Sequence, residues 1–204
     1  MEARTFTKSA LSLPSIFDFS QWLVGASRCH QRFLETFAKP ASGERVVDLG
    51  CGTGATLNHL PAGVSYVGID INPGYIRAAR DRFGNRGHFI CSDLATADLS
   101  AFPPFDLAVS VGVFHHLNDG EVQAVLELVR RIVRPGGRLV TLDPCYVPGQ
   151  SRIARFLKDH DRGRHIRDVE SYRELFSGND SFETVVLSDM LRVPYTHIVA
   201  KYTL

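Results

Sequence analysis

The chemistry-bearing residues of this chain stand closest together in the stretch 48–54, Asp-Leu-Gly-Cys-Gly-Thr-Gly. The apolar residues before it indicate a buried strand, and residues 55–57 indicate the start of a helix. Gly50 and Gly52 let the backbone bend and leave no Cβ between a ligand and the main chain. The spacing departs from the G-x-G-x-x-G loop that cradles a pyrophosphate, and the acid at Asp48 suits a positively charged ligand better than a phosphate.

Two further apolar runs also end in an acid. Residues 66–70 and 88–93 end in Asp70 and Asp93, and a fourth run at 106–113 is apolar enough to be buried on both faces of a sheet. In open α/β sheets, ligands bind at the carboxyl ends of the strands. Each acid alone is explained as well by a capped or solvated loop, but three acids ending three successive strands favour a binding site.

Helical patterns separate these strands. Asn72-Pro73 supplies an N-cap followed by proline at the first helical position, which predicts a helix to about residue 83. Apolar positions within 121–133 follow helical spacing, and 134–137 (Arg-Pro-Gly-Gly) should end that helix before a fifth strand at 138–143. Strands that alternate with helices predict a parallel, doubly wound sheet.

The two ends of the chain break this alternation. One or two helices are expected within residues 15–37, before the sheet. Strands at 182–187 and 195–202 are separated by about seven residues, too few for a helical crossover, so they should pair antiparallel. The expected fold class is α/β: a single Rossmann-like domain with a mostly parallel seven-stranded sheet and an antiparallel C-terminal strand pair.

Bulk composition excludes several classes of protein. The 204 residues fit one domain, and 23 Lys and Arg nearly cancel 22 Asp and Glu, so no global charge favours nucleic acid or an anionic membrane. The sequence contains neither an apolar run long enough to span a membrane nor a signal-peptide pattern. The four cysteines form no C-x-x-C pair, which predicts reduced thiols in a cytoplasmic protein.

The stretch 48–54 resembles the first motif, D-x-G-x-G-x-G, of class I S-adenosylmethionine (SAM)-dependent methyltransferases, of the small-molecule type with a type-11-like domain. Such enzymes also close a parallel sheet with an antiparallel strand pair, so the resemblance covers about residues 43–204. It implies SAM as cofactor, S-adenosylhomocysteine as product and a small-molecule methyl acceptor. The domain would comprise an N-terminal helical lid region (1–42), a SAM-binding core (43–145) and substrate-side helices with the terminal strand pair (146–204).

The resemblance assigns the amino-acid end of SAM to two strand ends. Gly50, Cys51 and Gly52 would pass under this part of the cofactor, and Asp48 would lie near its ammonium group, directly or through water. The backbone around Val111 would lie beneath the methionine portion.

The nucleoside end of SAM is assigned to the next two strand ends. Asp70 would accept both ribose hydroxyls in a bidentate, charge-assisted contact, and Ile71 would pack on the adenine. The Asp93 carboxylate would accept from the adenine amino group, while the Leu94 backbone N–H would reach a ring nitrogen.

His115-His116 lies in a Phe-His-His-Leu string just beyond the fourth strand, similar to the HHL segment of small-molecule methyltransferases. An imidazole near the transferred methyl group could take a proton from the acceptor, because its ordinary pKa suits neutral pH. Alternatively, one ring packs structurally and hydrogen-bonds the backbone while the other faces solvent.

A basic segment precedes the terminal strands. Arg162, Arg164, His165 and Arg167 could bind an acceptor that carries a carboxylate or phosphate. Interleaved aspartates favour the alternative of a solvated helix face.

Near the N-terminus, the aromatic stretch 16–22 could form a lid over SAM through Phe17 and Phe19, or pack on the sheet as a plain helix.

Three functions are consistent with these patterns to different degrees. The first is methyl transfer to a small molecule by in-line displacement, and the second is a catalytically inactive SAM-binding module that acts as a sensor or partner subunit. An NAD-dependent oxidoreductase is disfavoured by the glycine spacing. No Asn-Pro-Pro-Tyr or Asp-Pro-Pro-Tyr string, basic tail or metal-ligand spacing occurs, so neither a nucleic-acid substrate nor a metal site is expected.

Overall fold

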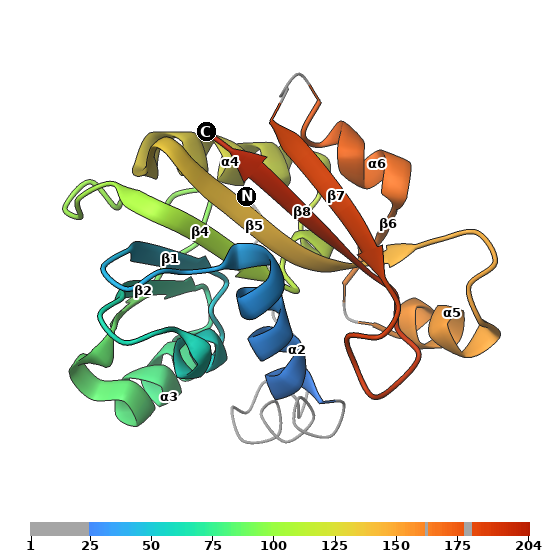
Figure 1. Ribbon diagram of the computed structural model, residues 1–204, viewed down its shortest axis with the longest axis horizontal. Helices are drawn as coiled ribbons and strands as arrows, with labels where there is room; N and C mark the ends of the chain where they lie inside the picture. Colours follow the sequence, from blue (N-terminus) through green and yellow to red (C-terminus); the bar gives the residue numbers. More distant parts are fainter. Residues whose placement is uncertain (1–24, 162, 178–180) are drawn as a thin grey trace, which may run out of the picture.

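The computed structural model describes residues 25–161, 163–177 and 181–204. Its centre is an eight-stranded sheet in which seven strands follow the order β3-β2-β1-β4-β5-β8-β7 and β6 pairs only with the end of β5 (Figure 1). The strands are β1 (Arg45–Leu49), β2 (Ser65–Asp70), β3 (His88–Cys91), β4 (Phe105–Val111), β5 (Val133–Tyr146), β6 (Arg167–Asp168), β7 (Phe182–Leu187) and β8 (His197–Thr203).

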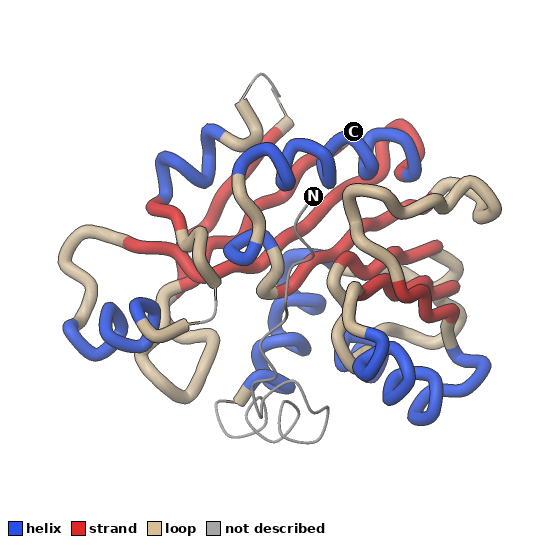
Figure 2. The backbone as a smooth tube through the Cα atoms, turned by 180° about the vertical axis from the view of Figure 1, so that it is seen from behind, coloured by secondary structure: helices blue, strands red, loops and turns tan. Residues whose placement is uncertain are grey.

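Helices cover both faces of the sheet (Figures 1 and 2). The described α-helices are α2 (Ala26–Phe33), α3 (Pro73–Phe83), α4 (Asp119–Ile132), α5 (Arg152–Asp159) and α6 (Val169–Glu174). Short helical turns are η2 (Leu34–Ala38), η3 (Ala55–His59), η4 (Gly84–Arg86) and η5 (Phe114–His116).

The alternation of side chains along the strands divides the core between these faces. On one face, Phe33 of α2 packs with Val46, while α3 covers the neighbouring Tyr66. On the other face, α4 and α6 bury Val47, Val125 and other apolar side chains in one large cluster. Strands buried on both faces are what parallel sheets require.

The sheet register brings distant segments to one edge. β1 pairs parallel with β2 and β4, and β4 pairs parallel with β5, so the residues that follow β1, β2, β3 and β4 all leave the sheet at the same edge. β8 runs antiparallel to β5, with His197 opposite Pro144. The start of β8 therefore lies at this edge too.

The predicted fold class is confirmed, including the antiparallel pair β7–β8. The helix predicted after Asn72-Pro73 is α3, and Asn72 caps it by accepting from the N–H groups of Gly74 and Tyr75. The helix predicted within 121–133 is α4, which begins with a capping box formed by Asn118 and Glu121.

Residues 55–57 start a helix as predicted, of the 3-10 type. Two other details differ from the expectations. Residues 134–137 do not separate a helix from a strand but form the irregular beginning of β5, where Gly136 N–H donates to the Leu204 carbonyl and Leu204 N–H to the Gly137 carbonyl. The short strand β6 was not predicted. In each case tertiary partners override the local pattern.

Candidate active site

The glycine loop after β1 turns through left-handed backbone conformations. The φ angles are +76° at Gly50, +54° at Gly52 and +78° at Gly54, a region that side chains disfavour. The N–H groups of Gly50 and Cys51 both donate to the Ile69 carbonyl, at 2.8 and 2.9 Å. The loop is thereby held against the end of β2.

Gly50 needs the absence of a Cβ for a reason that the sequence did not show. A Cβ at Gly50 would lie 2.4 Å from Cγ2 of Val113, in the segment after β4. At Gly50, therefore, a protein side chain rather than a ligand takes the space, and the glycine lets the first and fourth strand ends approach each other.

Asp48 lies beneath the loop and not at its surface. Its side chain is 1% exposed, and Oδ2 accepts a hydrogen bond from the Tyr66 hydroxyl at 2.8 Å. Burial raises the pKa of Asp48 to about 6, against the lowering effect of hydrogen bonds from Tyr66 and Thr56. This arrangement supports the loop from below, and the expected direct approach to an ammonium group would require this packing to open.

Asp70 joins two loops at the site. Oδ2 accepts from the Gly52 N–H at 2.9 Å, and Oδ1 accepts from the Asn72 N–H at 2.8 Å. Burial raises the pKa of Asp70, opposed by these two backbone bonds. Each carboxylate oxygen has a second lone pair, so the contacts leave acceptor capacity for two hydroxyl donors.

An open apolar and polar surface continues from Asp70. Ile71 is 52% exposed, one of a few large apolar side chains left open to solvent in the described chain. Asp93 is exposed and its Oδ1 accepts from the Ala95 N–H at 2.9 Å. Among the described residues the Leu94 N–H has no hydrogen-bond partner. A flat ring could pack on Ile71 and bond this free amide.

The end of β4 completes this part of the site. Val111 is half-buried, and the next residue, Gly112, has φ +66° and donates its N–H to the Leu142 carbonyl at 2.7 Å. The Ser110 hydroxyl donates to the Leu49 carbonyl at 3.3 Å, linking β4 to β1 below the loop.

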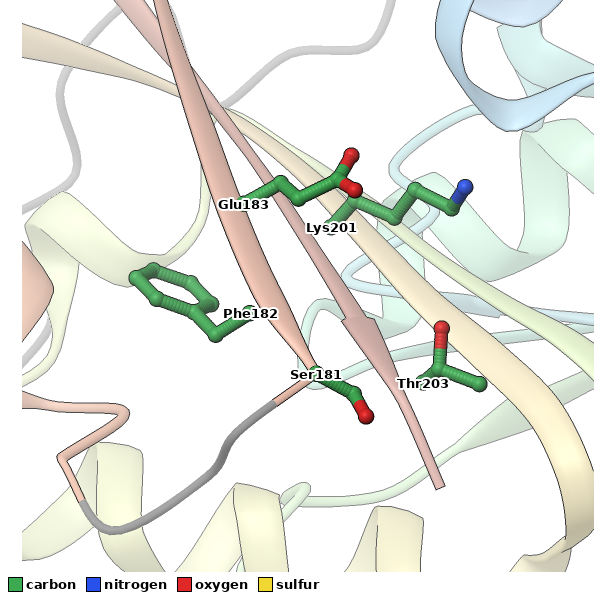
Figure 3. Close-up of a pocket in the computed structure, with 5 residues that line it drawn as sticks. All are labelled: Ser181, Phe182, Glu183, Lys201 and Thr203. Carbon is green, nitrogen blue, oxygen red and sulfur yellow. The ribbon is translucent and has the colours of Figure 1, made fainter.

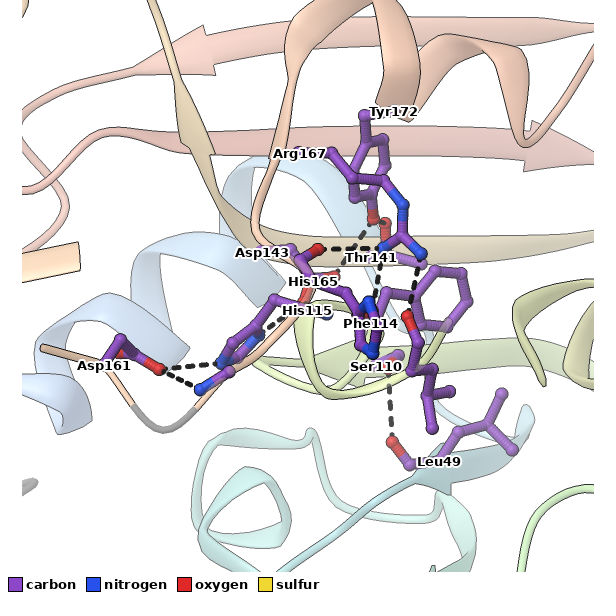
Figure 4. A network of polar contacts seen from close by, with 12 residues as sticks. Leu49, Ser110, Phe114, His115, Thr141, Asp143, Asp161, His165, Arg167 and Tyr172 are labelled. Carbon is purple, nitrogen blue, oxygen red and sulfur yellow. Dashed lines mark hydrogen bonds and ion pairs between the residues drawn. The ribbon is translucent and has the colours of Figure 1, made fainter. Parts of the chain in front are cut away.

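His115 is locked between two carboxylates (Figure 4). Nδ1 lies 3.0 Å from Oδ1 of Asp143, and Nε2 lies 3.3 Å from Oδ1 of Asp161. Burial alone would lower the pKa of His115, but the hydrogen bonds to Asp143 and Asp161 outweigh it and raise the pKa to about 9. Because both ring nitrogens are engaged by carboxylates, this geometry favours the structural alternative for His115, and the base role stays a prediction.

His116 is placed differently. Its side chain is exposed, and its ring packs on that of His115 with centroids 4.0 Å apart. Of the two histidines, only His116 has an exposed side chain.

Arg167 does not offer its guanidinium to a ligand. Its five N–H groups are all used: two donate to Oδ1 of Asp119 and the others to the carbonyls of Phe114, Leu117 and His165. These bonds fasten the segment around Arg167 to the residues that follow β4 and disfavour the expected contact with an anionic acceptor, which stays a prediction. Arg164 and His165 are exposed, while Arg162, Phe17 and Phe19 lie outside the described residues.

Several residues of this region escaped the sequence analysis. Asp143 is fully buried and accepts from the backbone and ring of His115 and from the Tyr172 hydroxyl. Asp161 also accepts from the Tyr195 hydroxyl at 2.8 Å, and hydrogen bonding to His115 holds its pKa below the usual range against the effect of burial. Asp143 ends the predicted strand 138–143, just as Asp70 and Asp93 end earlier apolar runs. An acid at the end of an apolar run could therefore have identified Asp143 from the sequence.

One surface hollow lies away from the strand ends that carry the glycine loop. It is lined by Ser181, Phe182, Glu183, Lys201 and Thr203 (Figure 3). These residues stand at the beginning of β7 and the end of β8, which the antiparallel register places at the opposite edge of the sheet. This hollow is therefore not part of the candidate active site.

Within the described parts of the chain, no group of three His, Cys, Asp or Glu side chains is arranged to hold a metal ion. Among the same residues, none of the helices is both long and apolar enough to cross a bilayer.

Known proteins resemble this chain in sequence. A family model described as "Methyltransferase domain" matches residues 47–139. Phosphoethanolamine N-methyltransferase 1 of Zea mays is 27% identical over 81% of the chain, and the chain spans about a third (33%) of the length of that relative. Ubiquinone/menaquinone biosynthesis C-methyltransferase UbiE of Burkholderia cenocepacia is 28% identical, with 80% of this chain and 72% of that protein covered.

Solved structures resemble it in fold. The Haemonchus contortus phosphoethanolamine N-methyltransferase 2, in complex with S-adenosyl-L-methionine, superposes on all of the chain (100%) and 60% of its own, with a TM-score of 0.76 at 14% identity. The matched segment 47–139 contains the glycine loop, Asp70 and the segment after β4. By the sequence match over residues 47–139 and by its fold, the chain resembles the class I S-adenosylmethionine-dependent methyltransferases.

Proposed function

We propose that this protein transfers the methyl group of SAM to a small-molecule acceptor. The observation that carries the proposal is the junction at Asp70, where one carboxylate holds the glycine loop and the start of α3 beside the exposed Ile71 and the free Leu94 amide. This junction offers two hydroxyl-binding lone-pair positions, an apolar platform and an amide donor, which match a ribose and an adenine. None of these groups is a phosphate-binding cation.

The residues present fit the cofactor from one end to the other. Asp70 would bind the ribose hydroxyls, Ile71 and Leu94 the adenine, and Asp93 the exocyclic amino group. The loop at Cys51 and Gly52 and the backbone at Val111 would line the methionine portion. Asp48 would act through the loop it supports, with its charge beneath the ammonium.

When bound, SAM supplies an electrophilic methyl group on a positively charged sulfur. Because this leaving group is already activated, the protein's task is to bring the acceptor into line and to exclude water. Gly50 and Val113 fix the distance between the cofactor loop and the segment that carries His115 and His116. If the acceptor must lose a proton, His116 is the exposed group beside this segment. Direct base catalysis then predicts a loss of turnover of roughly 10²–10⁴-fold in His116→Gln, whereas a smaller loss would assign the ring to packing on His115.

The names of the relatives supply candidate acceptors, a phosphoethanolamine and a quinone-type ring. An anionic acceptor would meet Arg164 and His165, which are exposed at the acceptor side. Arg167 holds that segment in place and adds no free charge.

The test has two steps. Calorimetric titration with SAM, S-adenosylhomocysteine and NAD should show binding of the first two and none of NAD. Release of S-adenosylhomocysteine is then measured with phosphoethanolamine and with a water-soluble demethylmenaquinol analogue. Binding of NAD in preference to SAM would overturn the cofactor assignment.

A second candidate, the SAM-binding module without catalysis, is favoured by one observation. The acceptor side is occupied by side chains that satisfy one another, from Tyr172 through Asp143 and His115 to Asp161. Tight SAM binding with no product from any acceptor would support this candidate over the enzyme.

A further inference from the structure

One buried polar atom in the described chain lacks a hydrogen-bond partner. His197, the first residue of β8, is 6% exposed, and its Nδ1 is the only buried side-chain nitrogen or oxygen of the described residues without a partner. A buried donor or acceptor left unpaired costs about 1–3 kcal/mol. Such a group calls for a specific explanation.

The atom lies at the edge where acceptor and cofactor would meet. His197 is opposite Pro144, directly after the buried Asp143 of β5. Its ring packs against that of Tyr195, with centroids 5.2 Å apart, and Tyr195 in turn bonds Asp161. The unpaired nitrogen thus belongs to the same end of the sheet as His115.

Every neighbouring polar group is already engaged. Asp143, His115 and Asp161 bond one another. Lys158, 1% exposed, donates to the carbonyl of Cys145 and to Oε1 of Gln150, with its ammonium 5.6 Å from the centre of the Tyr195 ring. Among the described residues, none of these groups forms a hydrogen bond with His197 Nδ1.

The charge of the surroundings limits what that partner can be. Two positive groups, His115 and Lys158, stand against two carboxylates, Asp143 and Asp161, which leaves no net charge to attract an ion. Burial, reinforced by the charge of Lys158, lowers the pKa of His197 to about 4, so the ring is neutral at pH 7. A neutral imidazole nitrogen pairs best with a neutral group, and a hydroxyl can donate to it or accept from it in either tautomer.

We propose that His197 Nδ1 contacts a hydroxyl group of the methyl acceptor, making the start of β8 a specificity-determining element of the acceptor site. The proposal rests on the methyltransferase function proposed above. It names the acceptor class as a hydroxyl-bearing compound, with aromatic character to match the ring of Tyr195. Access to Nδ1 requires the segment before β8 to shift, because Tyr195 packs on the imidazole.

The first test uses stability and needs no acceptor. His197→Leu removes an unpaired polar atom, so the melting temperature should stay unchanged or rise. Thr141→Val is the matched control, because the Thr141 hydroxyl has a buried partner, the Tyr172 hydroxyl, at 2.7 Å. It should lower the melting temperature. A comparable fall in His197→Leu would show that Nδ1 is bonded to a trapped structural water and would overturn the proposal.

The second test uses 1-naphthol as the hydroxyl probe. With S-adenosylhomocysteine bound, the probe should shift the imidazole nitrogen resonances of His197 in the whole protein, and phosphoethanolamine should not. If the phenol is methylated, His197→Leu should raise its KM at least tenfold with SAM affinity within twofold, and His197→Asn, which keeps a polar atom near the Nδ1 position, should recover part of the loss. No shift with 1-naphthol would overturn the hydroxyl contact, whereas failure to bind SAM would overturn the proposed function instead.

Discussion

The two halves of the candidate site differ in how much surface and hydrogen-bonding capacity they leave open. Around β1, β2 and β3, the glycine loop, Ile71 and the Leu94 amide leave surface and hydrogen-bonding capacity open. Around β5, β6 and β8, charged side chains are buried and bond one another, with His197 Nδ1 as the exception. We call the first half, which leaves these groups open, the receptive half. We call the second half, in which the charged side chains are buried and paired, the rigid half.

This difference explains why a charged side chain has hydrogen-bonding capacity left for a ligand in one half and none in the other. Asp70 is a carboxylate with spare lone pairs, and its charge is available to a ligand. Arg167 also carries a charged group, yet its five hydrogen bonds leave no N–H for an anion. Hydrogen-bond capacity that remains open, rather than charge, distinguishes binding residues from structural ones.

The largest effect on SAM binding is expected from a substitution at the close contact between two strand ends. Gly50→Val should abolish SAM binding, because its side chain would overlap Val113 and φ is +76°. Gly43→Val carries a similar φ of +86° with no atom within 4 Å of its Cβ, so it isolates backbone strain from the clash. Calorimetry with SAM and circular dichroism compare the variants. Normal SAM binding by Gly50→Val would show that the two strand ends need not approach closely.

Arg167→Ala tests the rigid half. Removing the guanidinium leaves three backbone carbonyls without their donor, which should lower the free energy of unfolding by about 3 kcal/mol or more. Arg173→Ala removes an exposed arginine that pairs with Glu170, and it should cost less than about 1 kcal/mol. Urea denaturation measures both. An equal, small loss in the two variants would contradict a fastening role for Arg167.

Asp70→Ala tests the receptive half. SAM affinity should weaken by about 2–5 kcal/mol, because a charge-assisted contact is lost together with the anchor of two loops. Asp98→Ala is the control, since Asp98 also accepts a backbone N–H, from Ser100, but is exposed and joins no second loop in the described chain. Near-normal affinity in Asp70→Ala by calorimetry would remove this residue from the site.

The free energy of unfolding should depend on pH because of His115 in the rigid half. Its pKa rises from an ordinary 6.5 to about 9 on folding, so its stabilisation is complete below pH 6.5 and is lost as pH rises through 9. The wild-type protein should lose on the order of 3 kcal/mol of unfolding free energy across this interval. His115→Gln should start lower and change little. Denaturation at several pH values checks this, and parallel curves for the two proteins would speak against the ion pairs.

The smallest effect is expected from a substitution of the exposed Arg164, measured as the KM for an acceptor. If the acceptor is anionic, the exposed Arg164 interacts with it through solvent, so Arg164→Ala should raise the KM for phosphoethanolamine by less than about threefold. The difference should vanish in high salt, with SAM affinity unchanged. A large, salt-independent increase would show that Arg164 is buried against the acceptor.

Sequence patterns predicted the backbone structure of the receptive half well because its elements are local, whereas the ligand contacts assigned there stay predictions. The glycine loop, the acid that ends β2 and the cap of α3 each occupy a few consecutive residues, and their structure follows from short-range turn and strand chemistry. The rigid half depends on partners far apart in the chain, such as Asp143 and Tyr172 or Arg167 and Asp119. An arginine that binds an anion and one that satisfies buried carbonyls look alike in sequence, and only tertiary packing distinguishes them.

The bridge made by Asp70 also has a consequence for how the cofactor binds. Because one carboxylate already fixes the glycine loop and the start of α3 to each other, these loops lose their conformational entropy during folding rather than during binding. Association should then proceed without a slow ordering step, and its entropy should carry little contribution from the loops. Under the proposed function, the folded chain would hold the nucleoside end of the site ready, and the remaining adjustment would fall to the acceptor side.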